Sequence, residues 1–254
     1  TEKLLTEAQD ALSTPSNVYG MFSNADLEFE DAIDKDGQAY PLTQGTFIKY
    51  LESDDRELRA SAFRNVYKAY GAHNNTLGAT LAGEVKKNVF NARTHHYRSA
   101  RERALSNNHI PEAVYDNLIK TVHKYLPLLH RYTKLRQELL GLDDLKMYDL
   151  YTPLVKDVKF EMPYEEAKSW MLKALEPMGE EYLNVVKEGL DNRWVDVYEN
   201  KGKRSGGYSS GGHLTNPFIL LNWSDTVSDL YTLVHEFGHS AHRDRKSTRL
   251  NSSH

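Results

Sequence analysis

The feature that most constrains this chain is the string His235-Glu236-Phe237-Gly238-His239 near its C-terminal end. On an α-helix, side chains four residues apart lie about 40° apart around the axis and one turn along it. Both imidazoles therefore project to one side, close enough to share one metal ion. Glu236 lies about 100° around from His235, beside that metal. The string predicts a helix with a two-histidine metal site.

The spacing fits the HExxH motif, in which two histidines bind zinc and the glutamate acts as a base. Such a glutamate can accept a proton from water and pass it to a leaving amine. We therefore predict that His235 and His239 bind one Zn²⁺ per chain in the complete enzyme, that Glu236 is the catalytic base, and that the reaction is peptide hydrolysis. The alternative is a buried helix whose two histidines are merely hydrogen-bonded.

The residues before the motif have the apolar pattern of a buried helix. Ser224 or Asp225 is the expected N-cap. Gly238 costs a helix about 1 kcal/mol relative to alanine, so another element is expected to pack tightly against the helix there. The apolar positions are Val227, Leu230, Tyr231, Leu233, Val234 and Phe237.

Composition excludes several classes of protein. Hydrophobic residues make up 39% of the chain and charged residues 27%, which argues against disorder, and the longest apolar run, Phe218–Leu221, is too short for a membrane span. A net charge of -4 gives no reason to expect nucleic acid as a partner. With no cysteine, a metal must use histidine and carboxylate ligands, and a reducing cytoplasm is favoured.

The rest of the chain predicts a mainly α fold with small β elements. Helices are expected to start near Thr43, at Asp54 as N-cap, near residue 74, at Pro111 and at Pro163. The helix after Pro111 should be interrupted or restarted at Pro127 and run up to Gly141, and the helix after Pro163 should be kinked near Pro177.

Two β-rich regions interrupt the helices. Leu27–Phe29 and Gln38–Leu42 flank a turn signal and predict a hairpin within residues 27–42. Strands are also expected at 194–198 and 217–223, within residues 194–223, with a glycine-rich loop between them.

The strand before the metal helix is expected to leave a free edge in the cleft, where an extended peptide could add by main-chain hydrogen bonds. The glycines of the preceding loop would let its backbone approach that peptide. The alternatives are a structural hairpin with a flexible turn and, for His213, an exposed loop histidine. The candidate substrate-binding residues are Gly206, Gly207, Tyr208, Ser209, Ser210, Gly211 and His213.

Several segments resemble the oligoendopeptidase F branch of the thimet-type zinc oligopeptidases. These are Asn24–Leu27, Asn108–Pro111, Met147–Tyr151, Asp196–Gly206, Thr215–Trp223 and Leu233–His239. The resemblance implies a mainly helical, thimet oligopeptidase-like fold with a deep channel and zinc-dependent cleavage of short peptides, typically in the bacterial cytoplasm. Nucleic acid and membrane are not expected partners.

The resemblance also implies residues that this sequence does not contain. The third zinc ligand of the family is a glutamate on a later helix, and its transition-state-stabilising histidine and tyrosine lie further on. We therefore expect a fold that is incomplete at both ends: residues 1–42 as the end of an N-terminal helical region plus the hairpin, and 43–243 as a partial catalytic domain. Residues 244–254, which resemble a translated sequencing adapter, are expected to be a non-native read-through tail; the alternative is a natural polar C-terminus.

Two other functions stay open at this point. One is a helical zinc carboxypeptidase, which a basic pocket for a substrate carboxylate would favour. The other is a non-catalytic peptide-binding helical fragment, because two imidazoles without a third protein ligand should hold zinc weakly.

Overall fold

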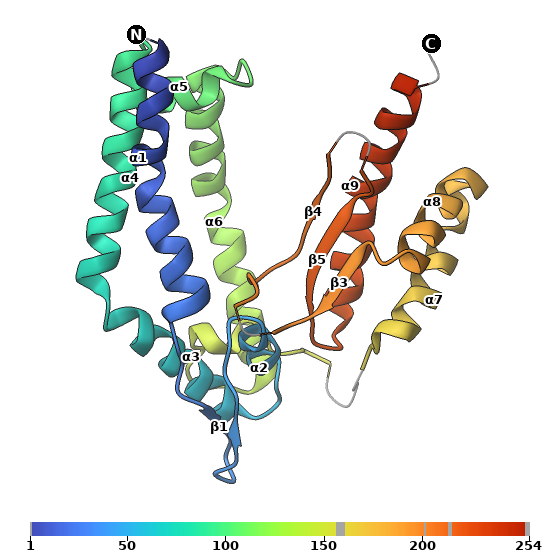
Figure 1. Ribbon diagram of the computed structural model, residues 1–254. Helices are drawn as coiled ribbons and strands as arrows, with labels where there is room; N and C mark the ends of the chain where they lie inside the picture. Colours follow the sequence, from blue (N-terminus) through green and yellow to red (C-terminus); the bar gives the residue numbers. More distant parts are fainter. Residues whose placement is uncertain (1, 156–160, 201, 213–214, 252–254) are drawn as a thin grey trace.

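The computed structural model describes residues 2–155, 161–200, 202–212 and 215–251, and its elements form two arms that diverge from a common base (Figure 1). The expected mainly α fold with small sheets is confirmed. The first arm contains α1 (Glu2–Met21), α4 (Asn74–Thr94), α5 (Ala100–Ser106) and α6 (Glu112–Leu140). The base contains the π-helix η1 (Phe22–Asp26), β1 (Ala32–Ile33), β2 (Ala39–Tyr40), α2 (Thr46–Leu51), α3 (Arg56–Gly71) and the 3₁₀ turn η2 (Met147–Asp149).

The second arm carries the HExxH helix. It contains α7 (Tyr164–Ala174), the 3₁₀ turn η3 (Glu176–Met178), α8 (Glu180–Asp191), β3 (Val195–Tyr198), β4 (Tyr208–Ser210), β5 (Phe218–Trp223) and α9 (Val227–Asn251). The kink expected near Pro177 is instead a break, because the chain leaves α7 after Ala174 and re-enters a helix only after Gly179.

Helix α6 follows Pro111 and ends at Gly141 in the left-handed conformation, as the sequence predicts. The break expected at Pro127 is wrong, because the helix runs through this residue. Proline removes one backbone hydrogen bond and frees the carbonyl of His123. Both residues are exposed, so water can solvate that carbonyl and the helix continues.

Side-chain caps fix where the base elements start. Asp55, and not the predicted Asp54, caps α3 by accepting hydrogen bonds from the amides of Glu57 and Leu58. In the hairpin, Asp34 accepts hydrogen bonds from the amides of Asp36 and Gln38. This tight turn pairs the residues close to it, so β1 lies at Ala32–Ile33 and the first strand predicted at 27–29 is wrong.

A three-stranded sheet positions the end of the chain. Its order is β3-β5-β4, with β5 parallel to β3 and antiparallel to β4. The strands predicted at 194–198 and 217–223 are confirmed, whereas part of the predicted glycine-rich loop is strand β4. Because β5 is central, the expectation that it offers a free edge is wrong: β4 forms the edge on that side.

The apolar core of the second arm lies between this sheet and helices α7, α8 and α9. Leu233 and Phe237 of α9 are completely buried, but Tyr231 is 73% exposed, so its predicted place in the core is wrong. The close approach expected at Gly238 occurs at Phe237 instead. A Cβ on Gly189 of α8 would lie 2.6 Å from the Phe237 ring, so only glycine fits there.

Candidate functional site

A side-chain cap starts helix α9 at the end of strand β5. Thr226 accepts a hydrogen bond from the amide of Asp229, and the Asp229 carboxylate accepts one from the amide of Thr226. The same carboxylate accepts hydrogen bonds from the amide and hydroxyl of Ser224. The cap is therefore Thr226 and not Ser224 or Asp225, although all three residues stand where the sequence predicts a helix start.

The two predicted metal ligands lie together on one side of α9. The Nε2 atoms of His235 and His239 are 3.1 Å apart, and the rings stand at 81° to each other with centroids 4.8 Å apart. Both side chains are exposed. The burial that the alternative assumes is therefore wrong for these two side chains, but their Nε2 atoms do lie at hydrogen-bonding distance from each other.

Glu236 lies on the neighbouring stripe of the same helix. Thr232, Glu236 and Ser240 recur every four residues and so share a face. Thr232 contacts the backbone of the glycine-rich segment, and the Ser240 hydroxyl lies 2.9 Å from that of Ser209 in β4. Glu236 stands between these two contacts and is only 8% exposed, so this carboxylate lies on the side of the helix that faces β4.

The pair of histidines fits zinc. Zinc–nitrogen bonds of about 2.0–2.1 Å in a tetrahedral site separate two nitrogens by about 3.3 Å. The observed 3.1 Å is close to that separation. Among the described residues, no further histidine, cysteine, aspartate or glutamate joins the pair to form a three-ligand cluster.

Strand β4 is held against α9 at its start. A Cβ on Gly207 would lie 2.8 Å from Cγ2 of Thr232 and 3.3 Å from Cδ2 of Leu221, so glycine is required for this approach. Asn222 of β5 donates hydrogen bonds to the carbonyls of Arg204 and Gly206. The predicted substrate-binding segment is thus a defined strand with a defined entry, beside the helix that carries the histidines.

The structure brings together some of the predicted site residues and not others. Gly207 and strand β4 (Tyr208–Ser210) lie against α9, and the position of a Cβ on Gly211 is 3.5 Å from Pro217. His213 lies outside the described residues. His242 is exposed on α9.

Two features of the site were missed by sequence reasoning. The hydroxyl contact between Ser209 and Ser240 joins residues 31 positions apart, and no periodicity signals it. Lys203, in the connector from β3 to β4, donates to the carbonyls of Asp196 and Tyr198 and pairs with the Asp196 carboxylate. In the sequence, Lys203 was indicated only by lying within Asp196–Gly206, one of the segments that carry the family resemblance.

Fold and site together define a mainly helical chain of the HExxH metallopeptidase class. The chain belongs to peptidase family M3, whose model matches residues 49–249. Within that family it falls in the oligoendopeptidase F branch, as its resemblance implies. None of the described helices is both long enough and apolar enough to cross a membrane.

The known relatives of this chain are longer proteins. It is 58% identical to oligopeptidase PepF of Bacillus subtilis over 95% of this chain and 36% of the relative. The crystal structure of oligoendopeptidase-F from Enterococcus faecium is 44% identical, with a TM-score of 0.60 over 76% of this chain and 36% of that one. A putative oligoendopeptidase F from Bacillus anthracis, at 19% identity, shares the fold with a TM-score of 0.78 over 95% of this chain and 44% of that one. The chain therefore spans less than half of the length of each of these relatives.

Proposed function

We propose that this chain is part of a zinc-dependent metalloendopeptidase that hydrolyses oligopeptides. The observation that carries the proposal is the pair of exposed imidazoles, with Nε2 atoms 3.1 Å apart, next to a glutamate that faces strand β4. The relatives named as oligopeptidases and oligoendopeptidases support the same reaction and substrate class.

His235 and His239 would hold the zinc through Nε2. Zinc, when bound, supplies a Lewis acid that polarises a peptide carbonyl and makes water a better nucleophile. Glu236 accepts the proton of the attacking water and returns it to the leaving amine, the usual work of a positioned general base and acid. Its low exposure, on the face of α9 that carries Thr232 and Ser240, supports a role for this carboxylate beside the strand proposed to hold the peptide.

Strand β4 is the proposed site of peptide pairing. One side of β4 is paired with β5, in the register Ser209 to Ile219, and β4 is the edge strand of the sheet among the described residues, so an added strand could pair with its other side. Main-chain hydrogen bonds tolerate many side chains, which suits an enzyme for varied short peptides. Gly206, Gly207, Tyr208, Ser209, Ser210 and Gly211 are the proposed contacts, and His213 is proposed with them from the sequence alone.

The proposed setting is a bacterial cytoplasm, with short peptides as the only partners and neither nucleic acid nor membrane. A third zinc ligand is proposed to come from polypeptide outside these 254 residues. The isolated chain should therefore bind zinc weakly and turn over little peptide, because two protein ligands hold a metal poorly. Stoichiometric zinc in the purified 254-residue chain would contradict the proposal that the third ligand comes from outside it.

The test uses the chain extended to the length of its relatives. Glu236→Gln should lower kcat for a quenched fluorescent oligopeptide by about 10²-fold or more, because the general base is lost. Zinc content, measured by atomic absorption, should not change, since both imidazoles remain.

Glu188→Gln is the matched control, because Glu188 is an exposed glutamate on the neighbouring helix α8. It should leave both kcat and zinc content unchanged. Wild-type turnover in the Glu236→Gln enzyme would show that Glu236 is not the catalytic base. Turnover that persists after zinc is chelated would show that the reaction does not need zinc.

A further inference from the structure

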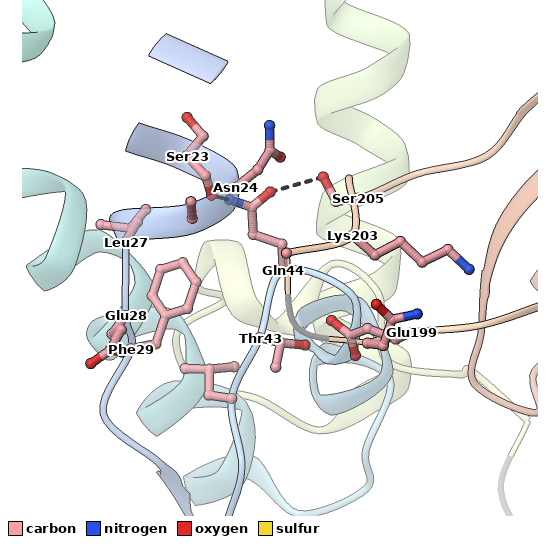
Figure 2. Close-up of a pocket in the computed structure, with 14 residues that line it drawn as sticks. Ser23, Asn24, Leu27, Glu28, Phe29, Thr43, Gln44, Glu199, Lys203 and Ser205 are labelled. Carbon is pink, nitrogen blue, oxygen red and sulfur yellow. Dashed lines mark hydrogen bonds between the residues drawn. The ribbon is translucent and has the colours of Figure 1, made fainter. Parts of the chain in front are cut away.

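The side chain of Gln44 ties the segment that leads into strand β4 to the base. The Ser205 hydroxyl donates to Oε1 of Gln44 at 2.8 Å, and Nε2 of Gln44 donates to the carbonyl of Ser23 at 2.7 Å. The same Nε2 lies 3.3 Å from the Tyr70 hydroxyl. Figure 2 shows Gln44 between Ser23 and Ser205, so its amide links the two segments.

The surroundings of this link are not densely packed. A cavity of about 480 Å³ and another of about 690 Å³ share Ser23, Asn24, Gln44 and Ser205 in their walls. Because cavities border the connector at Ser205, packing there is looser than at Gly207, which lies against Thr232 and Leu221. The hydrogen bond between Ser205 and Gln44 and those from Asn222 to the carbonyls of Arg204 and Gly206 help to fix its path.

The link is close in sequence to the substrate strand. Ser205 precedes Gly206, which has a φ of +86°, and Gly207, which packs against Thr232 of α9. The chain enters β4 at Tyr208. A displacement at Ser205 therefore reaches β4 within three residues, through a bend that only glycine adopts easily.

We propose that Gln44 is a positioning residue, which fixes the entry to β4 and thereby the edge on which peptide pairs. It does not contact the histidines or Glu236, and it acts through Ser205. The proposal rests on the proposed function for the role of β4 in peptide binding, but the positioning of the strand is a separate property of the chain.

A double-mutant cycle on the 254-residue chain tests the positioning. Gln44→Ala and Ser205→Ala should each speed amide hydrogen exchange in residues 206–210 by about fivefold, the effect of losing one intramolecular hydrogen bond. The double variant should exchange no faster than either single variant, because both remove the same link. Gln38→Ala, at an exposed position in the base hairpin, is the matched control and should change nothing.

Two results would overturn the proposal. Additive effects in the double variant would show that Gln44 does not act through Ser205. Unchanged exchange in Ser205→Ala would do the same, and that exposed substitution keeps the test valid if Gln44→Ala fails to fold.

Kinetics in the chain extended to the length of its relatives give the second readout. Either substitution should raise KM for an oligopeptide several-fold and change kcat by less than about twofold, the pattern of weakened uniform binding. A normal KM together with faster exchange would show that the position of β4 does not affect peptide binding, and would contradict its proposed role as the substrate strand. If the wild-type extended chain has no turnover, the proposed function fails, while the exchange experiment still decides whether Gln44 positions β4.

Discussion

Single residues determine how closely strand β4 can approach the HExxH helix, and at Gly207 even one added methyl group should disturb that approach. Gly207→Ala should destabilise the fold by about 1–3 kcal/mol, the usual cost of overpacking, because its Cβ would lie 2.8 Å from Cγ2 of Thr232. Urea unfolding followed by circular dichroism measures the change.

A second substitution identifies the cause of that loss. Thr232→Ser removes Cγ2 but keeps the hydroxyl that donates to the carbonyl of Ser228. In the Gly207→Ala background it should restore most of the lost stability. No rescue would mean that the alanine acts through the backbone conformation and not through this contact.

At the residue scale, the sequence predicts the site where chemistry depends on local spacing. His235, Glu236 and His239 are four residues apart or fewer, so helical geometry alone places them together. Gly207 and Ser209 could be proposed for the site but not explained, because their partners on α9 are brought close only by the sheet. No pattern within one segment encodes such a contact.

Among the elements, α3 and the η2 turn are joined by a buried carboxylate. Asp149 is fully buried and accepts hydrogen bonds from Arg56 and from the almost fully buried Arg59. Burial acts to raise the pKa of Asp149, but the hydrogen bonds from both arginines outweigh it and hold the pKa below its ordinary value. The fold therefore favours the charged form.

The sign of the pH dependence follows from this depressed pKa. Asp149 stabilises the fold above its unfolded-state pKa of about 3.9, and this stabilisation is lost as the pH falls through the lower folded-state value. Asp149→Asn should cost about 3–5 kcal/mol near neutral pH, because buried Arg59 loses its partner charge. The difference from wild type should shrink below about pH 4.

Unfolding free energies from urea titrations across this pH range measure the difference. Asp144→Asn is the control, since Asp144 pairs with Lys146 at the surface, where ion pairs contribute little. A gap between wild type and Asp149→Asn that does not change with pH would contradict the assignment of the charge to Asp149.

How far the elements could be predicted depends on whether their signals are local. Helices α6 and α9 start where their periodicity predicts, to within a residue or two, and the caps of α3 and α9 differ from the predicted ones because neighbouring aspartates, serines and threonines compete for that position. Strand β4 was missed because Tyr208–Ser210 is short and lies among glycines. It is a strand because β5 supplies its partner, and that pairing is a tertiary property.

On the scale of the whole molecule, the two arms differ in how far their apolar side chains are buried. The second arm encloses its own core between the sheet and three helices. In the first arm, α6 exposes large apolar side chains along its length, among them Leu118 and Leu129 at 60% and 53% exposure. An apolar face of this length on a 29-residue helix favours association with other apolar surfaces.

The charges on α6 determine how the 254-residue chain should associate. No aspartate or glutamate stands between residues 117 and 137, whereas Lys120, Lys124, Arg131 and Lys134 lie there. Two copies that paired through α6 would bring these like charges together, so salt should strengthen self-association by screening them.

Light scattering after size-exclusion chromatography should show a mass that rises with protein and salt concentration. Leu118→Gln combined with Leu129→Gln should lower that mass, whereas Leu81→Gln, at an equally exposed position on α4, should lower it less. A mass that falls as salt is added would mean that ion pairs, and not the apolar face of α6, hold the copies together.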